Sequence, residues 1–89
     1  MRPYNDKMKL KIVTPNELFY EGDVQHVRVP GEMGSLGILT GHAPLVTPIT
    51  KGDLEYRAAT GKTSKVKVEG GFLEVLKNRV LVLTDKVHV

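Results

Sequence analysis

The amino-acid sequence predicts an all-β domain of two packed sheets, with no helix longer than one turn. Its dominant hydrophobic period is two residues, which is typical of strands with one buried face. Turn signals recur at intervals of about eight to twelve residues, a spacing typical of sandwiches and barrels. No stretch has apolar residues at helical spacing without a glycine or proline inside it.

Five runs of the sequence are expected to form strands. In four of them apolar and polar residues alternate, and the fifth consists of apolar residues only. The five runs are Met8–Ile12, His26–Val29, Leu54–Ala58, Lys65–Glu69 and Val80–Leu83. The last run is apolar on both faces, so it is either central in the fold or covered on its outer side by a partner. Since the apolar face of a strand needs a second apolar layer, two packed sheets are the natural arrangement.

Turns are expected where glycine, proline, asparagine and aspartate cluster between these runs. The predicted turns are Pro15–Asn16, Glu21–Asp23, Lys51–Asp53, Thr60–Gly61, Gly70–Gly71 and Lys77–Asn78.

The segment Val29–Thr47 differs from all the others, because four glycines and two prolines surround a short apolar core. Proline fixes φ and glycine permits positive φ, so this backbone is expected to form tight turns rather than regular ladders. We interpret it as a surface shaped for contact; the alternative is that Gly31–Gly41 only turns a corner of the sheet.

Composition indicates one folded domain. The 89 residues are 40% hydrophobic and 26% charged, which argues against disorder. Residues 1–7 are expected to be an extension, and residues 8–89 a single β-sandwich domain. The chain has no cysteine, which excludes disulfides and thiolate metal sites. Its formal charge of +3 comes from dispersed lysines and arginines rather than from a dense basic patch.

No catalytic residue, metal ligand or cofactor site is predicted. Gly61-Lys62-Thr63 lacks the earlier glycine and the following helix of a phosphate-binding loop, so a hairpin turn is the better interpretation. The histidines lie in separate segments without acidic companions at ligand spacing. Single-stranded nucleic-acid binding would need exposed aromatics beside a basic groove, and Tyr56 and Phe72 are expected to fill the core instead.

The order of several motifs resembles the epsilon subunit of F-type ATP synthase. The motifs are Leu10–Pro15, Phe19–Val24, Val29–Leu39, Gly41–Thr47, Gly70–Val75 and Val80–Asp85. The Gly-His-Ala-Pro-Leu run at Gly41–Leu45 is the most specific of them. The resemblance covers nearly all of residues 9–85, and it implies a ten-stranded sandwich of two five-stranded, mostly antiparallel sheets.

The resemblance also implies a mechanical role without an active site. Members of the family link the gamma subunit to the membrane ring of c subunits, so that proton translocation is coupled to ATP synthesis. By position, the gamma-facing residues would be Thr14, His42, Ala43, Pro44, Leu45 and Thr47. The ring-facing loop would be Gly31, Glu32, Met33, Gly34 and Ser35. An alternative for His42 is a purely structural, hydrogen-bonded histidine.

Two departures from the family pattern stand out. Many members carry an acid where this chain has Ser35, which leaves Glu32 as the charged group of the loop, and a proline where it has Thr40. The family also usually continues into an inhibitory helical hairpin, which this sequence does not contain, so neither inhibition nor nucleotide binding is predicted. The implied location is the cytoplasmic face of a bacterial inner membrane, with the thylakoid stroma side and the mitochondrial matrix side as alternatives.

Two other classes of function stay open on the sequence alone. One is a small β-barrel that binds single-stranded nucleic acid. The other is a small β-sandwich enzyme or ligand-binding domain with a polar pocket near His42.

Overall fold

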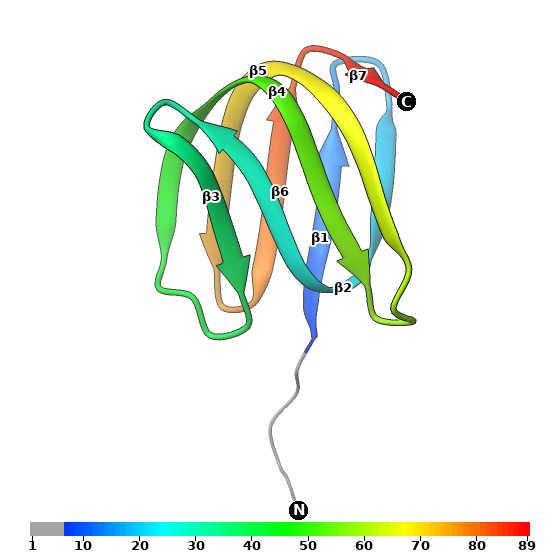
Figure 1. The fold of residues 1–89 in the computed structure, drawn as a ribbon, viewed down its shortest axis with the longest axis vertical. Helices are drawn as coiled ribbons and strands as arrows, with labels where there is room; N and C mark the ends of the chain where they lie inside the picture. Colours follow the sequence, from blue (N-terminus) through cyan, green and yellow to red (C-terminus); the bar gives the residue numbers. More distant parts are fainter. Residues whose placement is uncertain (1–6) are drawn as a thin grey trace, which may run out of the picture.

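The computed structural model of the protein describes residues 7–89, which form seven strands joined by short turns (Figure 1). Of the predicted extension at residues 1–7, all but Lys7 lies outside the described residues. No helix occurs within residues 7–89, as the absence of helical periodicity predicts. The strands are β1 Met8–Val13, β2 Leu18–Gly31, β3 Gly34–Leu39, β4 Leu45–Ala58, β5 Thr63–Leu76, β6 Arg79–Thr84 and β7 Val87–His88.

All seven strands belong to one sheet that closes on itself. The strand order is β1-β6-β5-β4-β2-β3, with β7 added to β5 and a further pairing between β1 and β2. That last pairing closes the ring, because β2 binds β1 with its first half and β4 and β3 with its second half. Every pair is antiparallel except β1 with β6. The result is a flattened barrel with two facing layers.

The prediction of ten strands in two separate sheets is wrong: the structure has seven strands in one continuous sheet. Three strands, β2, β4 and β5, are each 14 residues long and pass from one layer to the other, and β4 and β5 arch over the upper end in Figure 1. Three predicted turns, Glu21–Asp23, Lys51–Asp53 and Gly70–Gly71, lie inside these strands. Glycine lets a strand bend sharply without leaving its ladder, so these signals mark bends rather than ends.

We name the two layers after a strand that each contains. The β6 layer consists of residues 18–24 of β2, β1, β6, residues 71–76 of β5 and residues 45–49 of β4. The β3 layer consists of β3, residues 26–31 of β2, residues 51–58 of β4, residues 63–69 of β5 and β7.

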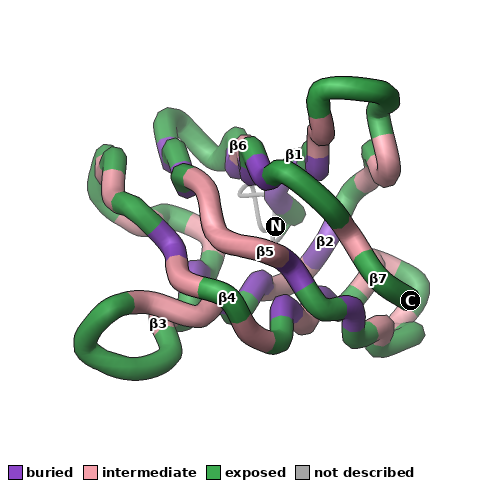
Figure 2. Tube along the Cα trace, turned by 90° about the horizontal axis from the view of Figure 1, so that it is seen from above, coloured by how far each residue is buried: buried purple, intermediate pink, exposed green. Residues whose placement is uncertain are grey.

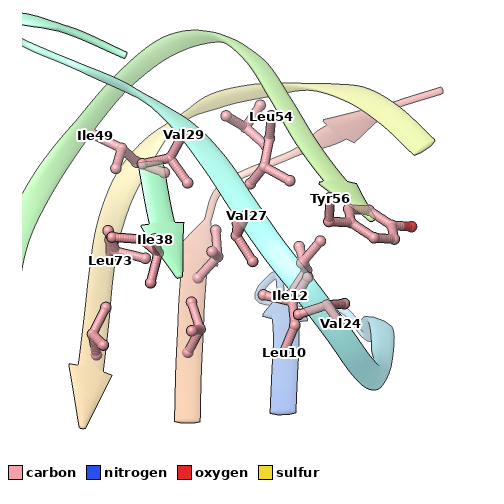
Figure 3. Close-up of a cluster of buried hydrophobic side chains, with 14 of the residues drawn as sticks. Leu10, Ile12, Val24, Val27, Val29, Ile38, Ile49, Leu54, Tyr56 and Leu73 are labelled. Carbon is pink, nitrogen blue, oxygen red and sulfur yellow. The ribbon is translucent and has the colours of Figure 1, made fainter. Parts of the chain in front are cut away.

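Buried positions occur along the strands of both layers (Figure 2). Their apolar side chains fill the space between the layers (Figure 3). The β3 layer contributes Val27, Val29 and Ile38, which point toward Leu10, Ile12 and Leu73 of the β6 layer. Each of the five predicted strand runs lies within a strand, and its alternation matches the observed faces. The tilted rings of Tyr20 and Tyr56, with centroids 4.4 Å apart, lie beside this core.

The glycine-rich segment Val29–Thr47 contains more regular structure than predicted. Its first half is the β2–β3 hairpin, a continuous antiparallel ladder with Glu32 and Met33 at the turn. Gly34 follows this turn with a φ of 114°, a conformation that favours glycine. Apart from this two-residue turn, only the connection between Leu39 and Leu45 lacks strand structure, so the expectation of tight turns throughout is wrong.

At Gly71 the backbone of β5 lies directly against that of β6. Gly71 has a φ of 132°, and a methyl group there would overlap the carbonyl oxygen of Leu83 and lie 2.9 Å from its carbonyl carbon. We therefore expect Gly71→Ala to lower the free energy of unfolding by about 2–4 kcal/mol, through backbone strain and overpacking. Denaturant unfolding measures this loss.

The matched control is Gly37→Ala, since Gly37 has a negative φ and open space where the methyl would be placed. It should leave the unfolding free energy within about 0.5 kcal/mol or raise it slightly. Equal effects of the two substitutions would show that the contact with Leu83 does not constrain the fold.

Candidate interaction surface

The outer face of the β6 layer carries a row of apolar side chains that crosses all five of its strand segments. Cross-strand pairing places Pro48, Phe72, Leu83, Val13 and Leu18 side by side. Phe72 is 55% exposed, Leu83 45% and Leu18 51%. The outer face of an antiparallel sheet is normally polar, so an apolar row across it indicates a surface that another molecule covers. We refer to these five residues as the apolar row.

Two further rows on the same face combine apolar and charged groups. The row next to the apolar row, on the side of the β5–β6 turn, contains Leu81 and Val46, which is 69% exposed. Leu76 lies in the row after that, nearer to the same turn. A shallow recess of about 500 Å³ opens there, with Lys11, Arg79, Glu21 and Glu74 among its lining residues. The face thus has an apolar centre and a charged margin, the usual anatomy of a protein interface.

The outer face of the β3 layer is different, because its charges pair with one another. The Lys67 ammonium lies 2.8 Å from the Asp53 carboxylate. Nε2 of His88 lies 2.9 Å from the Glu69 carboxylate. Lys51 approaches Glu69 to 3.9 Å. The hydrogen bond from Lys67, together with its charge, holds the pKa of Asp53 below its ordinary value. This face has the character of a solvated surface.

Five of the six residues expected to face gamma lie at the connection between β3 and β4. Three of them are in the connection itself, and the other two, Leu45 and Thr47, are at the start of β4. The Gly41 N–H donates to the Asn78 side chain over 2.8 Å, and the His42 N–H donates to the Leu39 carbonyl over 3.0 Å. Nδ1 of His42 lies 2.7 Å from the Ala43 carbonyl, which can only accept, so this nitrogen carries the proton. These bonds fix the connection against the β5–β6 turn, while Ala43 and Pro44 stay exposed.

The sixth expected residue, Thr14, lies apart from this group. Its Oγ1 accepts hydrogen bonds from the backbone N–H groups of Asn16 and Glu17, at 3.3 and 3.2 Å, in the β1–β2 turn. This turn is at the end of the barrel that carries β7, whereas the His42 connection is at the other end (Figure 1). The two are joined by the β6 layer, whose outer face lies between them.

The five residues of the expected ring-facing loop, Gly31 to Ser35, form the tip of the β2–β3 hairpin. Met33 is 99% exposed and Glu32 is exposed beside it. The tip and the His42 connection lie at opposite ends of β3 (Figure 1). Six residues of strand at about 3.3 Å each separate them by roughly 20 Å.

The apolar row as a whole was not predicted, although the run Val80–Leu83, which is apolar on both faces, indicated that the outer side of this strand could be covered by a partner. Phe72 was expected to fill the core, but its side chain points outward. In β5 the buried residues are Val66 and Val68 before the bend, and Leu73 and Val75 after it. The alternation therefore changes phase at Gly70–Gly71, and this puts Phe72 on the outer face. The signal that could have indicated it is the pair of apolar neighbours Phe72-Leu73, only one of which can face inward.

No enclosed reaction site was found in the described part of the chain. Within residues 7–89, no group of three histidine, aspartate or glutamate side chains is close enough to hold a metal ion. The search of these residues also found no helix that could cross a membrane. His42 lies on the surface, and the described depressions with polar linings are elsewhere and shallow.

Comparison with known proteins identifies the fold family. The profile of the beta-sandwich domain of the ATP synthase delta/epsilon chain matches residues 7–88. The chain belongs to this family. It is 46% identical over 80 residues to the ATP synthase epsilon chain of Carboxydothermus hydrogenoformans, covering 90% of this chain and 59% of that one. It is 44% identical over 78 residues to the cyanelle epsilon chain of Cyanophora paradoxa, covering 88% and 58%.

Two solved structures contain a chain with the same fold. A chain in the cryo-EM structure of the Euglena gracilis mitochondrial ATP synthase, OSCP/F1/c-ring, matches with a TM-score of 0.88 at 23% identity, covering 97% of this chain and 55% of that one. A chain of the Tetrahymena thermophila central stalk and c-ring matches with a TM-score of 0.75 at 17% identity, covering 91% and 65%. The chain spans about 54–62% of the length of the curated relatives that it matches.

Leu45 and Val46 are neighbours at the start of β4, but their side chains point to opposite faces of the sheet. Leu45 packs against the core, whereas Val46 points away from it. Leu45→Asp should therefore cost about 2–4 kcal/mol of unfolding free energy, because it buries a carboxylate without a partner. Val46→Asp should cost less than about 0.5 kcal/mol. Thermal or denaturant unfolding compares them, and equal losses would contradict the assigned orientation.

The Asp53–Lys67 pair gives a test of the polar face. Lys67→Met should raise the pKa of Asp53 toward its ordinary value, as measured by an NMR titration of the Asp53 carboxyl. In the native chain, the lowered pKa contributes stability above the ordinary pKa, and this contribution is lost as the pH falls through the lowered one. Lys9→Met, beside Asp23 on the other layer, is the control and should leave the pKa of Asp53 unchanged.

Proposed function

We propose that this domain is a non-catalytic rotor element of an F-type ATP synthase, which links the gamma subunit to the ring of c subunits. Membership of the epsilon family supports the assembly, and the exposed apolar face of the β6 layer supports the mode of action. The domain would transmit torque by its shape, so that proton-driven rotation of the ring reaches the catalytic subunits. Its location would be the cytoplasmic side of a bacterial inner membrane, or the stromal or matrix side in an organelle.

The β6 layer is the proposed docking face for gamma. In projection it measures roughly 20 by 20 Å, given strands about 4.8 Å apart and residues about 3.3 Å apart. This is about half of the ~800 Å² that a standard interface buries on each partner. If gamma covers the apolar row and extends over the edge of β4, it also reaches the His42 connection. This additional contact supplies the rest of the buried area. Such a subunit would also touch Thr14 in the β1–β2 turn. A single partner could therefore contact both Thr14 and the residues around His42, although these lie at opposite ends of the barrel (Figure 1).

The tip of the β2–β3 hairpin is the proposed contact with the ring. Glu32 and Met33 are exposed at the tip, and the ladder between β2 and β3 holds them on a short turn. A stiff hairpin loses little conformational entropy when it docks, which favours a durable contact. The separation between this tip and the His42 connection lets one domain contact two partners at once.

The alternative of single-stranded nucleic-acid binding fits the geometry less well. Such proteins stack bases on exposed aromatics beside a basic groove. Tyr56 is buried, and the cross-strand neighbours of Phe72 are Pro48 and Leu83 rather than cations. Phe72 therefore belongs to an apolar docking surface.

Charged substitutions in the apolar row test the proposed contact with gamma. Phe72→Asp and Leu83→Asp should each weaken binding to purified gamma subunit by tenfold or more, because a carboxylate would be buried without a partner at the interface. Both side chains point outward, so the unfolding free energy should change by less than about 1 kcal/mol. Calorimetric titration measures the affinity.

The matched control is Lys65→Asp, on the opposite outer face, which should leave the affinity for gamma unchanged. Wild-type affinity in both apolar-row variants would contradict the proposal, as would ATP hydrolysis by the isolated chain. Weakened binding in Lys65→Asp to the same extent would show that charge, rather than the apolar row, decides the association.

The contact with the ring is tested at the hairpin tip. Met33→Asp should leave gamma binding intact and reduce retention of the chain–gamma complex on detergent-solubilised c-ring, since Met33 is fully exposed and makes no contribution to the core. Unchanged retention would contradict the assigned role of the hairpin.

A further inference from the structure

The open edge of β3 differs from every other open edge of the sheet. Within residues 7–89, β3 pairs only with β2, so its other side has no strand partner. Natural sheets protect such edges with charged residues, prolines, bulges or very short strands. β3 has six residues, Gly34–Leu39, and the sequence Gly-Ser-Leu-Gly-Ile-Leu contains no charge and no proline.

The other open stretches all carry such protection. The first half of β4 is flanked by Pro44 and contains Pro48. The first half of β2 carries the exposed charges Glu21 and Asp23. β7 is only two residues long and is held by the His88–Glu69 contact. The lack of protection is therefore specific to β3.

The backbone groups that point outward from β3 can be assigned from the ladder. Gly31 pairs with Gly34 across the two-residue turn, and pairs in an antiparallel ladder alternate between bonded and non-bonded. The pair of Pro30 with Ser35 is a non-bonded one, in agreement with the missing N–H of Pro30. The N–H and C=O groups of Ser35 and Gly37 consequently point to the open edge, and no hydrogen bond of theirs is found across it among the described residues.

Neither position carries a large side chain, since Gly37 has none and Ser35 has a small one. Ser35 and Gly37 lie on the outer face of the β3 layer, and the space beside the Cα of Gly37 is open. An incoming strand can therefore approach the backbone without steric hindrance. On this face Arg28 lies opposite Gly37 on one side and opposite Glu55 of β4 on the other.

We propose that the edge of β3 receives an extended strand of the gamma-type stalk subunit. This inference rests on the proposed function and specifies how the partner binds. β3 runs from the hairpin tip to the His42 connection, so a strand added there continues the docking surface between the two proposed contacts.

Gly37→Pro tests the proposal with Gly37→Ala as its matched control. Proline removes the N–H that points to the open edge, and this N–H takes no part in the β2–β3 ladder. The φ of Gly37 is negative, as the φ of proline must be. We expect Gly37→Pro to weaken binding to purified gamma subunit at least tenfold, and Gly37→Ala to bind like the native chain. Equal affinities of the two variants would overturn the proposal.

Backbone hydrogen exchange gives a second readout that does not depend on a substitution. Binding of gamma should slow exchange at the amides of Ser35 and Gly37, whereas the amide of Lys65 should exchange as before. Unchanged exchange at Ser35 and Gly37 in the complex would refute strand addition, even if Gly37→Pro failed to fold.

The outcomes separate this proposal from the proposed function. If Phe72→Asp abolishes gamma binding while Gly37→Pro binds normally, the docking face stands and strand addition is wrong. If neither substitution affects binding, both are wrong. If the chain alone dimerises in light scattering and Gly37→Pro prevents it, while gamma binding is unchanged, the edge takes a second copy and our choice of occupant is overturned.

Discussion

The bend of β5 at Gly70–Gly71 is the constraint on which the arrangement of this domain depends. There the strand leaves one layer and enters the other, and its backbone comes into direct contact with that of β6 at Leu83. The pairing register with β4 is the same on both sides of the bend, from Lys51 with Glu69 to Ile49 with Gly71. Both strands therefore bend together, which keeps the ladder closed while the inward-facing residues change from one parity to the other.

The surface follows from this change of phase. The core takes Leu73 and Val75 after the bend, and Phe72 is turned outward beside Leu83 of β6. An apolar side chain on that face gains its burial only when another molecule covers it. The opposite layer pairs its charges within itself, as Lys67 does with Asp53, and needs no cover. The domain thus has one solvated face and one face with a row of exposed apolar side chains.

Local patterns in the sequence predict parts of five strands, because apolar and polar residues alternate in stretches as short as Met8–Ile12. They do not predict β3, where the glycines of Gly34–Leu39 indicated turns. They predict three of the six turns, including Lys77–Asn78, where both residues adopt positive φ. They fail at Glu21–Asp23, Lys51–Asp53 and Gly70–Gly71, because a glycine that bends a strand and one that ends it look alike in a sequence. That distinction is made by the neighbouring strand, which is distant along the chain. The number of strands and the outward position of Phe72 could not be predicted for the same reason, since both depend on strand pairing between distant parts of the chain.

The candidate site shows the same division between local and distant information. The resemblance to the family directs attention to the hairpin tip and to the His42 connection, and the structure places these at opposite ends of β3. It does not indicate the apolar row, since that row exists only when Pro48, Phe72, Leu83, Val13 and Leu18 are brought together from five segments.

Hydroxyl-radical footprinting of the chain with and without the purified gamma subunit examines the docking face without any substitution. If the β6 layer is that face, oxidation of Phe72 and Leu83 will fall strongly in the complex, while oxidation of His88 on the opposite layer stays unchanged. If Phe72 and Leu83 react as readily in the complex as in the free chain, the apolar row is not the docking surface and the account is wrong.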